Sequence, residues 1–386
     1  MDNTVRFFQT TPRLVTGPGA LNNVPEEIKR LGGGKVLIVT DAGLVASGLV
    51  ARLEGLLDKA RVAHARFDQV PADPPYEVAA SAALVAKETK ARVLIGIGGG
   101  SPIDIAKVAS ILAVNPEPVS AFFGIDLVPK AGLKTILIPT TAGTGSEVTP
   151  IAILSDHHEK LKKGIVSPYL FPACAILDPE LTLGLPPAVT AATGMDALIH
   201  AVEAYTSKNA TPLTDMLACE AMGLIFANLR TAYANGADLA AREAMMRGSM
   251  LAGMAFANAG VTAVHAFAYP IGAEFHIPHG VANSIMLTPV MEFNLLGCLP
   301  KFSRMAQVFG EQTANLSPRA AAGLAVEALR SLAQDLAVPM SLAPFGVRAE
   351  HVPELAQGVM KVTRLLANNP RVLTQADAEA IYRRVL

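Results

Sequence analysis

Apolar and polar residues are patterned along the first half of the chain as in a sheet covered by helices. Near-continuous apolar runs lie at 35–40 (KVLIVT), 92–98 (RVLIGIG), 133–141 (LKTILIPTT) and 174–179 (CAILDP). Between the early runs, the segments 45–60 and 76–90 repeat apolar residues at helical spacing. Strands that are apolar on both faces are typical of parallel strands joined through helices. The first half is therefore predicted to form an α/β domain with a parallel sheet.

The pattern changes at about residue 186. Beyond it no convincing alternating strand remains, and long segments rich in Ala, Leu and Met, such as 215–236 and 241–260, indicate helices. The paired prolines of LGLPPAVT mark the change, because proline interrupts both sheet ladders and helix interiors. We therefore predict two domains, an α/β domain at 1–185 and an all-α domain at 186–386.

Composition narrows the possible partners and the compartment. Lys plus Arg (32) nearly balances Asp plus Glu (33), which leaves no basic face for nucleic acid. Only Cys174, Cys219 and Cys298 are present, without CxxC spacing, so neither a disulfide framework nor a thiolate zinc site is expected. The first twenty residues lack the basic and apolar pattern of a secretion leader, and no apolar run is long enough to span a bilayer, so we expect neither a leader nor a membrane span. We expect a cytoplasmic protein without a membrane partner.

A glycine-rich turn follows the second apolar run. In GIGGGSPIDIAK (96–107), Gly98, Gly99 and Gly100 lead into a helix that starts near Ser101. Adjacent glycines let a diphosphate approach the backbone, and the N-terminal end of a helix stabilises its charge. The spacing is neither GxGxxG nor the GK[ST] ending of an ATP-binding loop. A tight strand-to-helix turn without a ligand is the alternative.

Three further features are candidate cofactor contacts. Asp41 follows the strand at 35–40, where a carboxylate can accept hydrogen bonds from an adenosine ribose and repel a 2′-phosphate, which favours NAD over NADP. Its alternative is to cap the next helix, and both roles are compatible. The segment PTTAGTGSEVT (139–149) offers hydroxyls and glycines, or is simply a polar loop. Lys163 offers a positive charge, or belongs to an exposed basic turn.

The second half carries a potential metal-ligand set. Asp196 and His200 are one helical turn apart in GMDALIHAVEAY, and His265 and His279 follow in VHAFAYPIGAEFHIPHG. One carboxylate with three imidazoles suits iron(II) or zinc rather than magnesium or calcium. A pair spaced i, i+4 also arises by chance in many helices, and a lone His on an apolar face is often a core residue.

Several motifs, in order and spacing, resemble those of the iron-containing (group III) alcohol dehydrogenases. They are GGGSPIDIAK, PTTAGTGSEVT, ATGMDALIHAVEAY, HAFAYPIGAEFHIPHGVAN and NPRVLTQADAEAIYRRVL. The resemblance covers essentially the whole chain. It implies a Rossmann-like nucleotide-binding domain and a helical metal-binding and catalytic domain, related to the dehydroquinate synthase architecture, with the cofactor in a cleft between them.

The resemblance also implies the site. Iron(II), with zinc as the alternative, would be held by Asp196, His200, His265 and His279. The implied cofactor contacts are Asp41, Gly98, Gly99, Gly100, Ser101, Asp104, Thr140, Thr141, Thr144, Lys163 and Leu181. The implied reaction is NAD-dependent interconversion of small primary alcohols or diols with aldehydes. We also expect a homo-oligomer, a dimer or a multiple of it.

One position departs from the family pattern. Many members place a second histidine four residues after the third ligand, where this chain has Tyr269. Because tyrosine normally titrates near pH ~10, we expect Tyr269 to shape the substrate pocket rather than relay protons. Two neighbouring residues each have alternative roles. His276 is a relay, a support of the metal site, or a surface or packing residue. Glu203 supports a ligand or forms an ordinary salt bridge.

Three functions are compatible with the sequence. The leading hypothesis is the alcohol dehydrogenase, in which a divalent cation polarises the substrate oxygen and nicotinamide takes the hydride. A dehydroquinate-synthase-like lyase also uses NAD and a metal, but it needs clustered basic residues that the region after 186 lacks. A cofactor-binding protein without turnover is the third.

Overall fold

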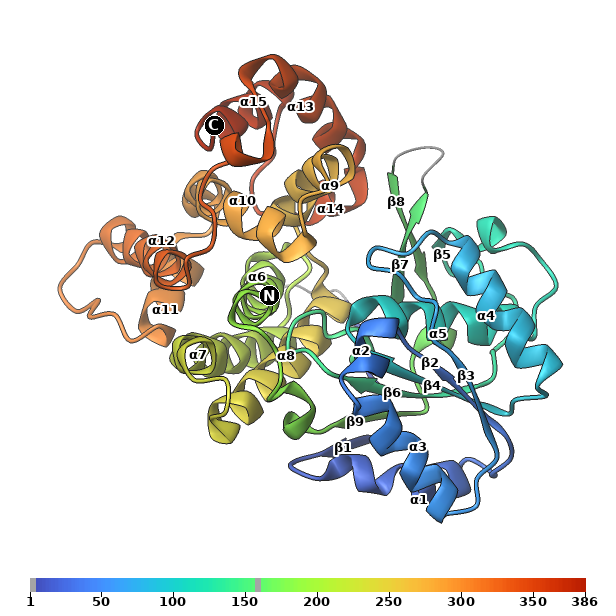
Figure 1. Ribbon diagram of the computed structural model, residues 1–386. Coiled ribbons are helices and arrows are strands. Elements are labelled where there is room, and N and C mark those ends of the chain that lie inside the picture. The colour runs from blue at the N-terminus through green and yellow to red at the C-terminus, as the bar shows by residue number, and fades with distance from the viewer. Residues whose placement is uncertain (1–4, 157–160) are drawn as a thin grey trace. The chain divides into compact units, whose positions relative to one another are not determined.

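A parallel sheet of six strands forms the centre of the first compact unit, Thr10–Gly184 (Figure 1). This computed structural model describes residues 5–156 and 161–386. The strand order across the sheet is β1-β9-β6-β4-β2-β3, and every neighbouring pair is parallel. The strands are β1 (Leu14–Thr16), β2 (Val36–Val39), β3 (His64–Phe67), β4 (Val93–Gly98), β6 (Lys134–Pro139) and β9 (Cys174–Leu177).

Helices cover both faces of this sheet. On β2, Leu37 and Val39 belong to the apolar core on the side of α4 (Glu77–Glu88) and α5 (Gly100–Leu112). Val36 and Ile38 belong to the core on the side of α1 (Val24–Arg30) and α3 (Leu49–Lys59). Successive side chains of a strand point to opposite faces, so a strand buried on both must be apolar at every position. This arrangement confirms the predicted parallel sheet.

The predicted helix at 45–60 is interrupted. The structure has two helices here, the short α2 (Ala42–Ala46) and then α3, which begins at Leu49. The break lies at Gly48, which takes a left-handed conformation with φ of 83°. Glycine adopts that conformation without the steric cost that other residues bear. The apolar spacing continues across the break, and for this reason the periodicity alone did not reveal it.

A second, smaller sheet was not predicted. It has the strand order β5-β8-β7, with β5 (Gly124–Ile125), β7 (Ile151–Asp156) and β8 (Leu161–Val166). The antiparallel pair β7 and β8 carries Lys163 opposite Leu154. Lys163 therefore lies on a strand and not in the exposed turn that was one interpretation of the sequence.

The second compact unit, Leu185–Leu386 together with residues 5–9, is helical. Its first helix begins at Pro187, the second of the paired prolines. The helical structure of this unit agrees with the all-α fold that was predicted for the second half of the chain. Its helices are α6 (Pro187–Thr206), α7 (Pro212–Ala234), α8 (Leu239–Ala259), α9 (Ala263–Phe275), α10 (His279–Asn294), α11 (Leu299–Val308), α12 (Pro318–Asp335), α13 (Val352–Lys361), α14 (Thr363–Asn368) and α15 (Gln375–Arg383).

No single helix in the described part of the chain is long and apolar enough to cross a membrane. Helices α8 and α9 meet the length and composition limits only as a pair, and they are bent by 102° at their junction. The three cysteines are free thiols.

Candidate functional site

Helix α6 presents three polar side chains on one face. Asp196, His200 and Glu203 are spaced by four and three residues, which places them one above the other along a helix. All three are buried, with exposed fractions of 3%, 6% and 0%. Buried polar groups need partners, and these come from two other helices.

Helices α9 and α10 bring the other candidate ligands to this face. His265 lies in the first turn of α9, and His279 is the first residue of α10. The next residue, Gly280, allows a close approach between α10 and α6, because a Cβ there would lie 2.3 Å from the carbonyl oxygen of Ala192. A larger residue at 280 would push the start of α10, and with it His279, away from Asp196.

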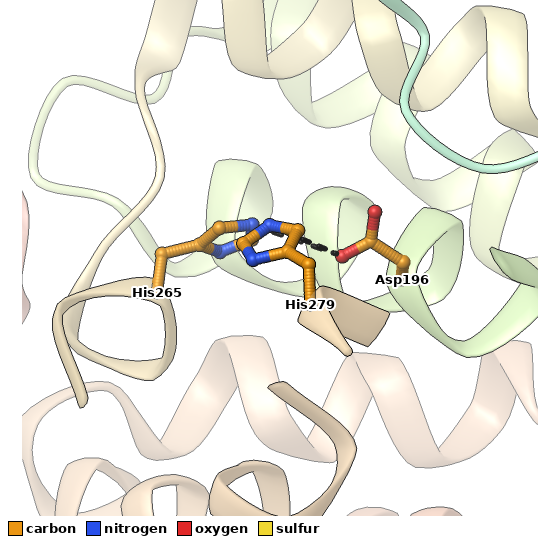
Figure 2. A group of neighbouring side chains, drawn as sticks. All are labelled: Asp196, His265 and His279. Carbon is orange, nitrogen blue, oxygen red and sulfur yellow. Dashed lines mark ion pairs between the residues drawn. The ribbon is translucent and has the colours of Figure 1, made fainter. Parts of the chain in front are cut away.

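The candidate ligand atoms converge. The Oδ1 atom of Asp196 is 3.9 Å from His265 Nε2 and 3.8 Å from His279 Nε2. These three residues offer ligand atoms within 4.8 Å of one another, and Figure 2 shows both imidazoles turned toward the carboxylate. The fourth predicted ligand adjoins them, with His200 Nε2 3.1 Å from His265 Nε2. The structure thus brings together the predicted set from residues 83 positions apart in sequence.

Glu203 contacts the side of the His265 ring that faces away from Asp196. One of its carboxylate oxygens, Oε2, forms a short hydrogen bond with His265 Nδ1. The other, Oε1, accepts hydrogen bonds from Thr262 N at 3.1 Å, Thr262 Oγ1 at 2.6 Å and Val264 N at 2.7 Å. A carboxylate on Nδ1 keeps the proton there and leaves the lone pair on Nε2, the atom that faces Asp196. Of the two sequence interpretations, the structure favours the supporting role over the ordinary salt bridge.

The charges of the site are coupled. Burial by itself raises the pKa of Asp196, but His200, His279 and His265 outweigh it and hold that pKa below its usual value. Burial by itself lowers the pKa of His265, but Glu203 and then Asp196 outweigh it and raise that pKa. The interior therefore favours an ionised Asp196 surrounded by groups that can compensate its charge.

Aromatic rings border the ligand set. Phe256 stacks on His200 with ring centroids 4.4 Å apart. The Tyr269 ring lies 6.5 Å from that of His265 and 6.2 Å from that of His279, and burial raises the pKa of Tyr269 to about 12. His276 is exposed and ends α9 in a left-handed conformation, which fits the surface role among its alternatives.

In the first unit, three neighbouring parallel strands end at one edge of the sheet. The order β6-β4-β2 places Thr140, Gly98 and Thr40 with Asp41 at this edge. The Thr140 N–H donates to the Gly98 carbonyl at 2.9 Å, and a Cβ at Gly98 would lie 3.4 Å from Asp41 Oδ2. Ligands of open α/β sheets bind at such carboxyl ends.

The glycine turn leaves the start of α5 open. Gly98 has φ of 148°, and a Cβ there would lie 2.7 Å from Pro102 Cγ, so the turn requires glycine. Gly99 and Gly100 approach Thr141 and Thr144, and the described residues provide no side-chain cap for the first N–H groups of α5. Ser101 lies in this first turn. Such a helix start is suited to a phosphate.

Asp41 also caps a helix. Its Oδ1 accepts from Leu44 N at 2.8 Å at the start of α2, while Oδ2 is the atom nearest Gly98. The cap and the predicted ribose contact would use different oxygens, so the cap is observed and leaves the ribose contact possible as a prediction.

Helix α5 carries a buried charged network that the sequence analysis missed. The Lys107 ammonium, fully buried, donates to Ser146 Oγ at 2.8 Å and to the carbonyls of Thr149 and Ile151. Asp104 accepts from Ser146 and from Ile153 N. Burial lowers the pKa of Lys107 to about 8. The network ties the loop at 140–149 to α5, and the AK pair that ends GGGSPIDIAK was its sequence signal.

Three predicted cofactor residues have other partners in the structure, the first being Asp104 of this network. Lys163 forms an ion pair with Asp156 at 2.8 Å and lies over the Phe123 ring. Leu181 is 2% exposed and belongs to the core beside α1 and α3. Their contact with a cofactor stays a prediction.

Known proteins match this chain over its full length. The family described as iron-containing alcohol dehydrogenase matches residues 11–179, and the C-terminal part of the Fe-containing alcohol dehydrogenase family matches 190–386. The chain belongs to this family. The family resemblance and the two-part fold predicted from the sequence are thereby confirmed, and the protein is an oxidoreductase of the alcohol dehydrogenase type.

Three relatives show how this family varies. A long-chain-alcohol dehydrogenase 1 of Geobacillus thermodenitrificans is 44% identical over 95% of this chain and 93% of its own length. A crystal structure of 1,3-propanediol oxidoreductase has a TM-score of 0.97 at 38% identity, covering 99% and 100% of the two chains. A sulfoacetaldehyde reductase from Bifidobacterium kashiwanohense, solved with NAD+, has a TM-score of 0.89 at 28% identity and covers 99% of both.

The contact between Glu203 and His265 generates a prediction for this dehydrogenase. In Glu203→Gln, the amide oxygen still accepts from Thr262 and Val264, but the amide NH2 faces His265 Nδ1. The imidazole proton must then move to Nε2, which removes the lone pair needed for a metal. Metal affinity should fall about 10- to 100-fold, measured by chelator competition, while the melting temperature stays close to that of the parent.

Glu203→Ala provides the contrast. It leaves the Thr262 and Val264 donors buried without an acceptor, so unfolding free energy should fall by about 3 kcal/mol or more in chemical denaturation. Equal metal affinity in the parent and the Gln variant would show that Glu203 does not set the tautomer of His265.

Proposed function

We propose that this protein catalyses the NAD-linked interconversion of small primary alcohols or diols and aldehydes with one divalent metal ion, iron(II) in the first place and zinc as the alternative. The proposed ligands are Asp196, His200, His265 and His279. The observation that carries the proposal is the convergence of one carboxylate and three imidazoles from three helices, all of them buried except the partly exposed His279.

The donor set fits such an ion. Imidazole nitrogens and one carboxylate oxygen are ligands that iron(II) and zinc share. The single negative charge of Asp196 offsets part of the charge of a dication, and Glu203 directs the Nε2 lone pair of His265 toward Asp196. The side chain of His279 is one-third exposed, unlike the buried His265, which leaves an approach for a substrate from that side.

When bound, the cation supplies Lewis acidity toward an alcohol or carbonyl oxygen, and nicotinamide exchanges the hydride. The chain itself contributes orientation and exclusion of water. Phe256 covers one face of His200, and Tyr269 places a ring beside His265 and His279. These rings are the proposed walls of a pocket for the carbon chain of the substrate.

The first unit is the proposed nucleotide carrier. Asp41 Oδ2 would accept from the adenosine ribose and repel a 2′-phosphate, which favours NAD over NADP. The open start of α5 at Gly98–Ser101 would hold the pyrophosphate, with Thr140, Thr141 and Thr144 beside it. The NAD+ complex of the 28%-identical sulfoacetaldehyde reductase supports this choice of cofactor. Asp104, Lys163 and Leu181 complete the proposed contacts.

The substrate class rests on the relatives. Their names cover a long-chain alcohol, a diol and a sulfonated aldehyde, so the shared chemistry is a primary alcohol or aldehyde group. We further propose a cytoplasmic homo-oligomer, a dimer or a multiple of it, in keeping with three free thiols and a nearly balanced charge.

The metal site is tested by removing one imidazole at a time. His265→Ala and His279→Ala should each lose most bound iron or zinc and most NADH production from alcohols, because a ligand is removed from a single site. His276→Asn is the matched control, since residue 276 is exposed and Asn tolerates a left-handed backbone. Full, tight metal occupancy in both alanine variants, measured by elemental analysis, would refute the ligand assignment.

Cofactor choice is tested at Asp41. Asp41→Gly should raise kcat/KM with NADP relative to NAD by about tenfold, equivalent to ~1.4 kcal/mol, because a like-charge contact is removed. Glycine costs only a few tenths of a kcal/mol at a helix cap. Asp41→Asn keeps a cap acceptor and should shift the preference in the same direction. A parent enzyme that already prefers NADP would contradict the role given to Asp41.

Tyr269 is tested by separating its ring from its hydroxyl. Burial raises the pKa of Tyr269 to about 12, so the hydroxyl is a poor proton acceptor or exchanger at neutral pH. Tyr269→Phe should therefore keep most of kcat with a modest change in KM, whereas Tyr269→Ala should change which chain lengths are accepted. General acid–base groups contribute about 10²- to 10⁴-fold in rate. A loss of that size in the Phe variant, with metal still bound, would place Tyr269 in the proton path.

A further inference from the structure

Asn283 lies among the candidate ligand atoms, although no motif pointed to it. It is one helical turn after His279 on α10 and is fully buried. Its Nδ2 donates to Asp196 Oδ1 at 2.8 Å and lies 3.2 Å from His265 Nε2 and 3.1 Å from His279 Nε2. One amide end therefore faces three of the four proposed ligands.

The other end of this amide has no partner. Asn283 Oδ1 is buried and makes no hydrogen bond with any residue that the structure describes. Buried polar atoms are nearly always paired, so an unpaired amide oxygen beside a ligand set indicates a partner of another kind. A half-turn about the bond to the amide exchanges its oxygen and nitrogen with little other movement.

The sign of the amide dipole decides which end can face a cation. The Nε2 atom of each imidazole has one lone pair, and a hydrogen-bond donor and a metal ion cannot share it. An NH2 group directed at a dication is repelled, whereas an amide oxygen is attracted and is itself a known ligand of hard cations. The half-turn gives up the hydrogen bond to Asp196 and brings the unpaired oxygen to the ligand set.

We propose that Asn283 supplies its side-chain oxygen as an additional ligand of the divalent cation. This inference rests on the proposed function, because it requires the cation held by Asp196 and the histidines. An extra neutral oxygen suits iron(II), which accepts more than four ligands, better than zinc, whose sites are mostly four-coordinate. Asn283 would thus bias the site toward iron.

Chelator competition under anaerobic conditions tests the proposal with iron(II) and with zinc on the full-length protein. Asn283→Ala should weaken iron(II) binding at least about tenfold and zinc binding less. Asn283→Asp keeps an oxygen at the same place and should bind iron(II) at least as tightly as the parent. Ser284→Ala is the matched control: the Ser284 hydroxyl next to Asn283 donates to the Gly280 carbonyl at 2.6 Å, and both affinities should stay unchanged.

The variants distinguish a failure of the Asn283 proposal from a failure of the proposed metal site. If the amide serves only as a donor to Asp196, Asn283→Asp loses as much affinity as Asn283→Ala, and the proposal is overturned. It is also overturned if both variants bind iron(II) like the parent. Should the alanine variant fail to fold, the aspartate variant alone decides between these roles. Asp196→Ala tests the underlying site: if it binds metal like the parent, the proposed function fails as well.

Discussion

The structure of the helical unit depends on keeping the buried carboxylate of Asp196 compensated. A charged group inside a protein is costly unless other groups supply opposite charge or hydrogen bonds. Here α6, α9 and α10 each direct a polar group to it, and Gly280 permits the helix approach that makes this possible. Because one carboxylate and several imidazoles share one focus, the arrangement supports the proposed cation site in addition to the compensation of Asp196.

The second buried carboxylate of α6, that of Glu203, has a different structural role. Glu203 accepts from the backbone at the start of α9, where the first N–H groups of a helix lack partners within the helix. The side chain thus anchors α9 and orients His265 together. Because both carboxylates of α6 find their partners on other helices, displacing one helix would leave several buried groups unpaired at once, which favours a single arrangement of the three.

The sequence was informative where local rules suffice. Apolar runs located β2, β4, β6 and β9, and the i, i+4 spacing located Asp196 and His200. It was silent on the edge strand β3, whose residues His64 and Arg66 are polar, and on the Lys-rich β8. Gly48 interrupts an unbroken periodicity. The contact of Glu203 with His265, and the place of Asn283, depend on tertiary packing over many residues, which no local pattern encodes.

The nucleotide-binding edge of the first unit and the metal-ligand set of the second differ in how they are built, and this difference explains which of their residues the sequence could reveal. The proposed nucleotide-binding edge consists of backbone at strand ends, so glycines and hydroxyl residues mark it in the sequence. Lys107 holds the loop at 140–149 through hydrogen bonds to Ser146 and Thr149. The proposed metal site consists of side chains from distant helices, and its geometry depends on supporting residues such as Glu203. The family motifs point to the four proposed ligands, whereas the neighbours that would tune the choice of metal, Glu203 and Asn283, are found only from tertiary contacts.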